Sequence, residues 1–288
     1  NLVGRVTDGK NPIEGAVVSD GFTVTTTDAQ GVYQMRVKKS TPFVFVSVPA
    51  DCEIPVENGM PKIYKKIALG DNDVVQRSFT LERTGKKERF TLLALADVQI
   101  GRDDEVVMLE KEVLPLLVPY VQQLDKPVYG ISLGDLVWDN MPFHSVYKEQ
   151  IRKIGVPVFQ VIGNHDHDLN KYTDREATEN YRRHFGPTYY AFDMGRTHYI
   201  VLDDIVYHGA KKYEEQIDTM QLRWAAAYAE RLPAGSRVCI AMHAPAMKSW
   251  LGNRVMESAE RLMDAFAGHE LHFITGHTHL NSNYDIRE

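Results

Sequence analysis

The first 85 residues alternate between short runs of apolar or β-branched residues and tight-turn residues. The runs lie within GRVTDG, AVVSDG, FTVTTTDAQG and VYQMRV, and Asp-Gly or Gln-Gly pairs separate them. This spacing is typical of a small antiparallel β-sandwich. The charged, turn-forming stretch at residues 82–89 reads as a linker. We therefore expect a β-sandwich domain at residues 1–85 and a second domain at residues 86–288.

Beyond the linker, longer apolar runs alternate with helical patterns. Five of these runs read as buried strands, and each ends at a polar cluster: FTLLALA before Asp97, VYGISL before Gly134, VFQVI before Gly163, VCIAM before His243 and LHFIT before Gly276. YYAFDMG and THYIVLDD read as a hairpin. Helices are expected for about 20 residues from Asp103, near Val146, and over Gln216 to Arg231 and Val255 to Ala267, with Pro115 and Pro119 kinking or interrupting the first. This alternation predicts an α/β fold with helices packed outside the sheet.

The polar clusters contain side chains that bind metal ions. They offer two carboxylates, two amides and three imidazoles: Asp97, Asp135, Gln99, Asn164, His243, His277 and His279. Ligands of open α/β sheets gather in the crevice at the strand ends, so we expect these groups to converge. Mixed oxygen and imidazole donors argue against a closed structural zinc site and favour manganese, iron or zinc with open positions. Two divalent ions and two carboxylates leave positive charge that suits a phosphoryl group.

The clusters, taken in order, resemble the motifs of the calcineurin-like metallophosphoesterase superfamily. That pattern is Asp-x-His, Gly-Asp, Gly-Asn-His-Asp/Glu, a solitary His and Gly-His-x-His, and four of the five blocks match unchanged over roughly residues 90 to 280. The resemblance implies two facing mixed β-sheets flanked by helices, a four-layer sandwich with the metals at the sheet edge. It also implies a dimetal-dependent hydrolase for a phosphomonoester or phosphodiester, in which a metal-bridging hydroxide attacks phosphorus.

The same resemblance implies a role for each matched residue. Asp97 and His279 would hold the first metal, Asn164, His243 and His277 the second, and Asp135 would bridge them. His165 would protonate the leaving oxygen, and Asp166 would hold its ring in orientation.

Gln99 departs from the pattern, because most of the superfamily has histidine there. A neutral amide oxygen is a weaker donor than imidazole, so we expect a weaker first site that depends on added manganese or magnesium. Among the metals, manganese is favoured. The alternative is a binding or scaffold protein with a catalytically weakened site. A metallo-β-lactamase is excluded by the missing His-x-His-x-Asp-His cluster, and a protein phosphatase is disfavoured because Trp138-Asp139-Asn140 replaces the usual Asp-Arg-Gly.

Residues 2–37 resemble the carboxypeptidase-regulatory-like β-sandwich domain through their Pro-Ile-x-Gly-Ala and Thr-Thr-Asp-x-x-Gly-x-Tyr patterns. Such modules typically precede bacterial enzymes outside the cytoplasm, so we expect an extracytoplasmic location. The chain stops nine residues after His279, and we expect further C-terminal sequence in the native protein, with the final NSNYDIRE beginning a second sheet.

The composition limits the classes of molecule that the protein is expected to bind. The net charge is −6 without a basic run, which disfavours duplex nucleic acid, and no apolar stretch approaches the ~20 residues that span a bilayer. The expected partner is a small phosphate ester, such as that of a nucleoside or sugar, in a pocket shaped by loops 136–145, 167–175 and 207–212. His184, His198, His269 and His272 are expected to be structural or exposed. For His144, His167 and His208, a role in binding substrate stays open. The aromatic side chains of Trp138, Phe143 and Tyr172 could either pack within their loops or stack on a base or sugar of the substrate.

Overall fold

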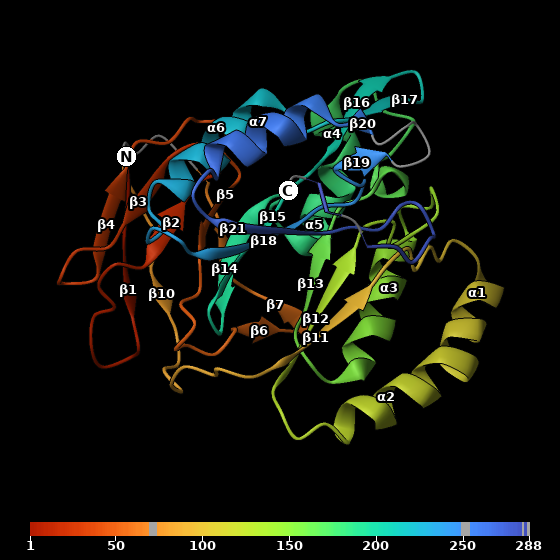
Figure 1. Ribbon diagram of the computed structural model, residues 1–288, viewed down its shortest axis with the longest axis horizontal. Coiled ribbons are helices and arrows are strands. Elements are labelled where there is room, and N and C mark those ends of the chain that lie inside the picture. The colour runs from red at the N-terminus through yellow and green to blue at the C-terminus, as the bar shows by residue number, and fades with distance from the viewer. Residues whose placement is uncertain (69–73, 249–253, 284, 287–288) are drawn as a thin grey trace.

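The computed structural model describes residues 1–68, 74–248, 254–283 and 285–286, and Figure 1 shows its layers. The N-terminal part consists of two four-stranded sheets and a short ribbon. One sheet contains β1 (Leu2–Thr7), β4 (Val32–Met35), β9 (Val75–Gln76) and β10 (Phe79–Thr80), and the other has the order β3 (Val24–Thr26), β2 (Val17–Ser19), β5 (Phe43–Val46) and β8 (Tyr64–Lys66). The ribbon pairs β6 (Val56–Glu57) with β7 (Met60–Pro61).

The sequence predicts an antiparallel sandwich, and the all-β architecture is confirmed with one difference in strand direction. β9 and β10 run parallel to β1, whereas β1 and β4 are antiparallel. The chain reaches β9 from β8, which belongs to the other sheet, so a hairpin turn does not set its direction. Leu2 and Val6 point into the core from alternate positions of β1, while all four residues of β5 are buried because both of its faces are covered.

Two further sheets face each other in the second part of the chain. The first is parallel and has the order β11 (Thr91–Leu95), β12 (Val128–Leu133) and β13 (Val158–Val161). The second is mixed and has the order β14 (Tyr190–Met194), β15 (Thr197–Val201), β18 (Arg237–Ala241) and β21 (Glu270–Ile274). Phe159 of β13 stacks on Phe192 of β14 with ring centroids 3.6 Å apart, which brings the inner faces together. All five predicted strands that precede polar clusters are therefore present.

Helices cover the outer faces of both sheets, which confirms the predicted layered α/β architecture. α1 (Asp103–Met108), α2 (Leu114–Gln122) and α3 (Phe143–Ile151) lie beside the parallel sheet, and α6 (Thr219–Ala229) and α7 (Glu257–Ala265) lie against the mixed sheet (Figure 1). α4 (Asp174–Ala177) and α5 (Glu179–Phe185) follow the loop after β13, and 3₁₀ turns occupy Arg152–Ile154 and Asn164–Asp166. The remaining strands form two ribbons: β16 (Ile205–Gly209) with β17 (Lys212–Glu215), and β19 (Met247–Lys248) with β20 (Arg254–Val255).

The two prolines of the first predicted helix are accommodated without breaking it. A π-helical turn, Leu109–Val113, joins α1 to α2 immediately before Pro115, which lies in the first turn of α2. Because α2 continues the π turn, Pro115 interrupts the hydrogen bonding of a helical path in which the preceding Leu114 N–H still bonds to the Leu109 carbonyl. Pro119 lies inside α2. A π turn is a known way to absorb such an irregularity, so the helical path continues to Gln122.

The N-terminal sandwich packs against the mixed-sheet side of the second part. Trp224 of α6 is fully buried at this contact, where its indole N–H donates to the Ser19 hydroxyl at 2.9 Å and its ring meets Phe45 edge-on. The Tyr189 hydroxyl donates to the carbonyl of Gly21 at 2.7 Å. One continuous apolar core includes residues from both parts.

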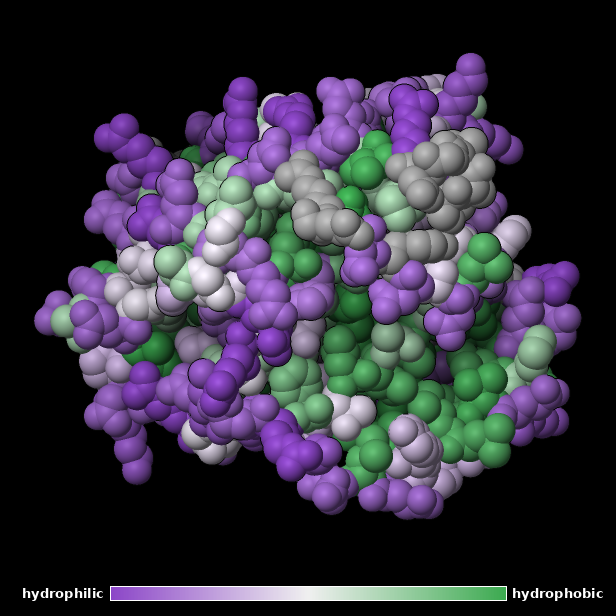
Figure 2. Space-filling view, viewed as in Figure 1, coloured by the Kyte–Doolittle hydropathy of each residue, from purple (hydrophilic) through white to green (hydrophobic). Residues whose placement is uncertain are grey.

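Each of the two sheets has an edge strand without a fully buried residue, β11 in the parallel sheet and β21 in the mixed sheet. Leu92, Leu93 and Leu95 of β11 are only partly buried, and α2 exposes Leu116 and Tyr120. Figure 2 shows a broad apolar area in the lower right of this face, where Figure 1 places β11, β12 and α2. In the described part of the chain, no helix is long and apolar enough to cross a membrane. The predicted strand in residues 281–288 lies partly outside the described residues, and those described there are not in a strand.

Candidate metal centre

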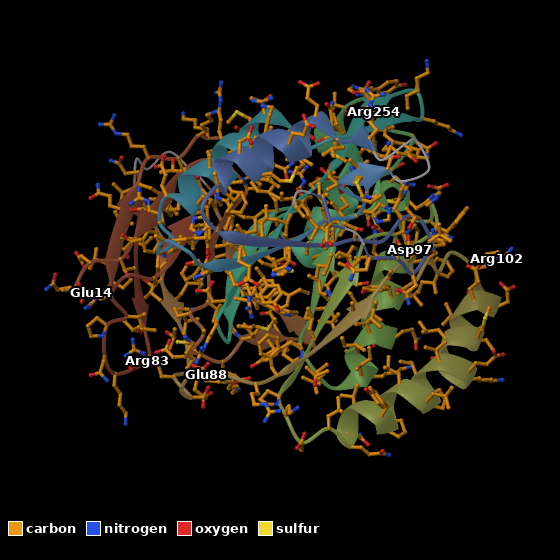
Figure 3. All side chains as sticks on the ribbon, in the orientation of Figure 1. Glu14, Arg83, Glu88, Asp97, Arg102 and Arg254 are labelled. Carbon is orange, nitrogen blue, oxygen red and sulfur yellow. The ribbon has the colours of Figure 1, made fainter. Side chains whose placement is uncertain are left out.

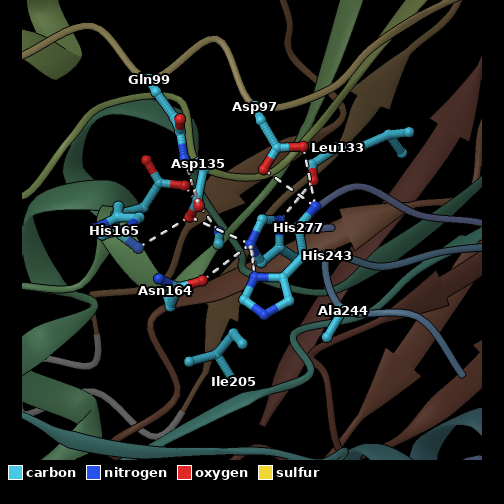
Figure 4. A network of polar contacts seen from close by, with 12 residues as sticks. Asp97, Gln99, Leu133, Asp135, Asn164, His165, Ile205, His243, Ala244 and His277 are labelled. Atoms are coloured by element: carbon cyan, nitrogen blue, oxygen red, sulfur yellow. Dashed lines mark hydrogen bonds and ion pairs between the residues drawn. The ribbon is translucent and has the colours of Figure 1, made fainter. Parts of the chain in front are cut away.

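The predicted polar clusters meet at the carboxyl ends of β11, β12, β13, β18 and β21. Asp97 follows β11 and lies on the right of the molecule in Figure 3, and Figure 4 shows the groups around it. The close-up places Asp97, Asp135, Asn164, His243 and His277 around one space, with Gln99 beside Asp135. Residues up to 180 positions apart in the sequence thus lie within hydrogen-bonding distance.

Three atoms that could act as metal ligands surround Nε2 of His243, which is itself a possible ligand. Asn164 Oδ1 lies 3.0 Å from it, His277 Nδ1 3.1 Å and Asp135 Oδ1 3.3 Å. Two ligands at a right angle on an ion with bonds of about 2.1 Å would lie about 3.0 Å apart. The spacing and the donor types therefore fit a divalent ion, and the ligand atoms of Asp135, His243 and His277 lie within 4.8 Å of one another. We refer to Asp135, Asn164, His243 and His277 as the His243 cluster.

The second group, the Asp97 cluster, is more open. It consists of Asp97, Gln99 and His279, beside the Asp135 that it shares with the His243 cluster. His279 Nε2 lies 3.4 Å from Asp97 Oδ1, and more than half of the His279 side chain is exposed. The amide nitrogen of Gln99 donates to Asp135 Oδ2 at 3.2 Å. Since amide oxygen and nitrogen are assigned from hydrogen bonding, turning this amide would present the oxygen instead.

The backbone at these strand ends takes a form that most residues avoid. Among the described residues, nine other than glycine have positive φ, and six of them belong to or adjoin the centre: Asp97, Gln99, Asp135, Asp139, His277 and His279. Each such residue costs of order 1–3 kcal/mol unless its surroundings compensate. Hydrogen bonds supply part of this compensation: the Gln99 N–H donates to the Asp135 carbonyl, and the His277 N–H donates to the Asp97 carboxylate at 2.9 Å.

Two glycines let the strand ends approach closely. A Cβ on Gly134, whose φ is +87°, would lie 2.3 Å from His243 Nδ1. A Cβ on Gly163 would lie 2.2 Å from the Asp135 backbone nitrogen. Both positions therefore require glycine for the His243 cluster to form.

Buried carboxylates determine the charge of the centre. Burial is the strongest single influence on Asp135 and would raise its pKa, but the hydrogen bond and charge of His243, together with those of His165, lower the pKa overall. Burial raises the pKa of Asp97 against the opposing effect of His243. Burial is the strongest single influence on His243 and lowers its pKa, but the hydrogen bond and charge of Asp135, the charge of Asp204 and the Leu133 carbonyl together raise it to about 9. Without a metal, a proton on His243 balances the negative charge, and a divalent ion would displace it.

The ring of His165 is held by two residues of the loop after β12. Its Nδ1 lies 2.9 Å from Asp139 Oδ1, and Trp138 stacks on it with centroids 4.1 Å apart and an interplanar angle of 18°. The backbone N–H of His165 donates to Asp135 Oδ1 at 2.9 Å, which ties this residue to the His243 cluster.

The prediction that Asp166 orients His165 is wrong. Among the described residues, the hydrogen bonds of Asp166 go to the backbone N–H groups of Leu136, Val137 and Gly163 and to His144 Nε2, and not to the His165 ring. Asp166 is fully buried and joins the two loops, because backbone N–H groups surround its carboxylate. Asp139 is the carboxylate that contacts His165.

Two further residues support the histidines and were missed by the sequence reasoning. The Asp204 carboxylate accepts the backbone N–H groups of His243 and Ala244 at 2.9 and 2.8 Å, and burial raises its pKa to about 6. Glu215 Oε1 lies 3.3 Å from His277 Nε2. The hydrogen bond with His277 and the ion pair with Lys248 lower the pKa of Glu215 to about 2, although burial opposes them. Asp204 ends an apolar run, as the predicted residues do, whereas Glu215 is the last residue of the polar strand β17.

The remaining candidates fall mostly outside the centre. His144 and His167 are buried and bonded to Asn180 and the Gly163 carbonyl, which indicates structural roles. His208 is half exposed and pairs with Glu214. Trp138 is half exposed and stacks on His165, Phe143 is the first residue of α3 and packs against the core, and Tyr172 is exposed.

Comparisons with known proteins agree with this geometry. The family model described as Calcineurin-like phosphoesterase matches residues 90–281, and the one described as N terminal of Calcineurin-like phosphoesterase matches residues 1–84. No curated protein matches the chain.

Similar solved structures include the purple acid phosphatase PPD1 from yellow lupin (Lupinus luteus) seeds. It has 12% identity and a TM-score of 0.48, and the match covers 69% of this chain and 41% of that chain. Phosphopantetheinyl hydrolase (PptH) from Mycobacterium tuberculosis has 13% identity and a TM-score of 0.36, over 69% of this chain and 87% of that chain. This chain therefore spans about two-fifths of the lupin protein. Because both TM-scores lie below 0.5, the family assignment rests on the two family matches.

Proposed function

The chain belongs to the calcineurin-like phosphoesterase family, a family of hydrolases that use divalent metals, and we propose that it is a dimetal-dependent phosphoesterase acting on a phosphomonoester or phosphodiester. The observation that carries this proposal is the His243 cluster, in which an amide oxygen, a carboxylate oxygen and a second imidazole lie 3.0–3.3 Å from one imidazole nitrogen. Such a donor set suits manganese, iron or zinc, and manganese is favoured by the oxygen-rich Asp97 cluster.

Each predicted ligand has a place in this proposal. Asn164, His243 and His277 would hold one ion, Asp97, Gln99 and His279 the other, and Asp135 would bridge them. When bound, the ions would lower the pKa of a coordinated water and neutralise charge on the phosphoryl group. Gln99 would use its amide oxygen, which requires the amide to turn away from its present hydrogen bond with Asp135.

His165 is proposed as the acid that protonates the leaving oxygen. As an imidazolium, the ring can donate its Nε2 proton while Nδ1–H stays bonded to Asp139. Trp138 restrains the ring from one face. Asp139 and Trp138 would therefore be positioning residues, and His165 the residue that contacts substrate.

The substrate would approach from the side of Trp138 and the β16–β17 ribbon. Tyr213 of β17 is partly exposed, and burial, followed by the charge of Glu215, raises its pKa. Exposed aromatic rings beside an anion site suit a phosphate ester with a flat or ring-shaped group, such as a nucleoside or sugar.

Hydrolysis of p-nitrophenyl phosphate and bis-p-nitrophenyl phosphate by purified protein tests the proposal. We expect turnover of one or both with manganese, loss of turnover with a chelator, and recovery when manganese is added back. Asp135→Asn, which replaces the charged ligand by a neutral amide, should weaken the binding of both metals and lower activity, and the preferred ester would distinguish monoesterase from diesterase. Protein that contains both metals and turns over neither ester would instead support a narrow, nucleotide-like substrate or the binding-protein alternative.

A further inference from the structure

Glu215 contacts one imidazole of the His243 cluster from outside the predicted ligand set. It is the last residue of β17, and only 17% of its side chain is exposed. Its Oε1 lies 3.3 Å from Nε2 of His277, whereas Nδ1 of the same ring lies 3.1 Å from His243 Nε2. The carboxylate is therefore bonded to the ring nitrogen that does not face the other donors.

This arrangement determines which nitrogen of His277 can bind a metal. A neutral imidazole carries one proton, and Nδ1 has a free lone pair only when that proton is on Nε2. A proton on Nε2 requires an acceptor in a half-buried place, and Glu215 is the acceptor present. His243 follows the same rule with the nitrogens exchanged, because its Nδ1 donates to the Leu133 carbonyl at 2.8 Å and its Nε2 faces the other donors.

Glu215 is itself held from two sides. Lys248 of β19 forms an ion pair with its other oxygen, Oε2. The next residue, Gln216, donates its backbone N–H to the Asp204 carbonyl at 2.8 Å, and the Asp204 carboxylate binds the backbone of His243. The end of the β16–β17 ribbon at Glu215 therefore lies next to both supporting carboxylates, Glu215 at His277 and Asp204 at His243.

We propose that Glu215 is a positioning residue that fixes the tautomer and orientation of His277, and so selectively strengthens the metal site of the His243 cluster. This inference rests on the proposed function, since it assumes that the cluster binds a divalent ion. Partners in this position commonly change metal affinity by about 10–100-fold. We expect Glu215→Gln to weaken one ion by that factor and to leave the ion of the Asp97 cluster little changed.

Titration of metal-free protein with MnCl₂ by calorimetry provides the test. Glu214→Gln is the matched control: it removes the same charge from the same strand, its side chain is 64% exposed, and it pairs with His208 instead of His277. Lys248→Met is a second variant that breaks the ion pair but keeps the carboxylate. Visible absorption of the Co²⁺-loaded proteins reports the ligand geometry, and thermal unfolding of the metal-free variants reports folding.

The expected result is two manganese ions in the wild type and in Glu214→Gln, and one selectively weakened ion with an altered Co²⁺ spectrum in Glu215→Gln. Lys248→Met should have a smaller effect than Glu215→Gln. Unchanged affinities in Glu215→Gln, or equal weakening of both ions, would overturn the inference while leaving the proposed function intact. A wild type that binds neither Mn²⁺ nor Co²⁺ would overturn both.

Discussion

Replacing Asp139 with asparagine tests whether this residue acts through His165. Asparagine keeps nearly the same shape and an acceptor oxygen for Nδ1 of His165, which lies 2.9 Å from Asp139 Oδ1, but it removes the charge. It also tolerates the positive φ of 53° at this position, so the backbone should not be strained. We expect the variant to fold and bind metals as the wild type does, and to be slower with substrates whose leaving group needs a proton.

The size of the loss follows from the type of hydrogen bond. A bond to a charged group contributes about 1.5–3 kcal/mol and a neutral one about 0.5–1.5 kcal/mol. The difference of about 1–1.5 kcal/mol corresponds to a decrease of about 5- to 15-fold in rate. Because 21% of the His165 side chain and 40% of the Asp139 side chain are exposed, water screens the pair and the lower end of this range is expected.

The assay compares kcat for phenyl phosphate and p-nitrophenyl phosphate under saturating manganese. p-Nitrophenolate leaves readily without a proton, whereas phenolate benefits more from an acid. Asp139→Asn should therefore slow phenyl phosphate more than p-nitrophenyl phosphate. Asp104→Asn, which removes an exposed carboxylate paired with Arg102, is the charge control and should leave both rates unchanged.

A double variant decides whether the effect passes through His165. In a His165→Ala background, Asp139→Asn should cause no further loss, since the group that it positions is absent. The reasoning fails if the two substrates slow equally, or if the loss is undiminished when His165 has been removed.

Three other predictions concern stability. Asp166→Asn replaces one acceptor oxygen by an N–H group that faces the buried backbone N–H donors of Leu136 and Gly163. Each buried donor left without an acceptor costs about 1–3 kcal/mol, so urea unfolding should show a free energy of unfolding lower by several kcal/mol. An unchanged urea midpoint would contradict the role of Asp166 in joining the two loops. Burial lowers the pKa of His184 from 6.5 to about 4, so the unfolded chain binds this proton first and the free energy of unfolding should fall as the pH drops through that interval. His184→Gln should reduce the slope of the free energy of unfolding against pH by the equivalent of up to one proton. An identical slope in the wild type and the variant would exclude a contribution of His184. Adding manganese to chelator-treated protein at 100 times its Kd should raise the free energy of unfolding by about 2.7 kcal/mol per site, visible as a higher Tm, and no shift would argue against metal binding.

The sequence predicted the strand ends well because burial leaves a clear signal there. Five apolar runs stop at polar residues, and strand-end geometry then brings Asp97, Asp135, Asn164, His243 and His277 together. The same reasoning applied to THYIVLDD would have found Asp204, which ends this apolar run shortly after the buried strand β15. The division at residue 85 and the metal-binding roles themselves stay predictions.

The supporting carboxylates could not be found in this way, because their roles depend on loop geometry. Asp139 lies in a polar loop, and it contacts His165 only because the backbone turns at positive φ and its N–H reaches the His165 carbonyl. Glu215 lies 62 positions before His277 on a strand without apolar periodicity. The parallel direction of β9 and β10 likewise follows from a crossing between sheets that no local pattern records.

The positive φ values at the metal centre affect how substitutions there should be chosen. Aspartate, asparagine and histidine tolerate left-handed backbone better than most residues, and aspartate and histidine occupy five of the six positions. Alanine at Asp97, Asp135 or His277 would therefore change two things at once, removing a ligand and raising the energy of the turn that carries it. Stability losses in such alanine variants would overstate what the metals contribute to folding. Asparagine replacements, which keep the preference for the turn, separate the energy of coordination from the energy of the backbone.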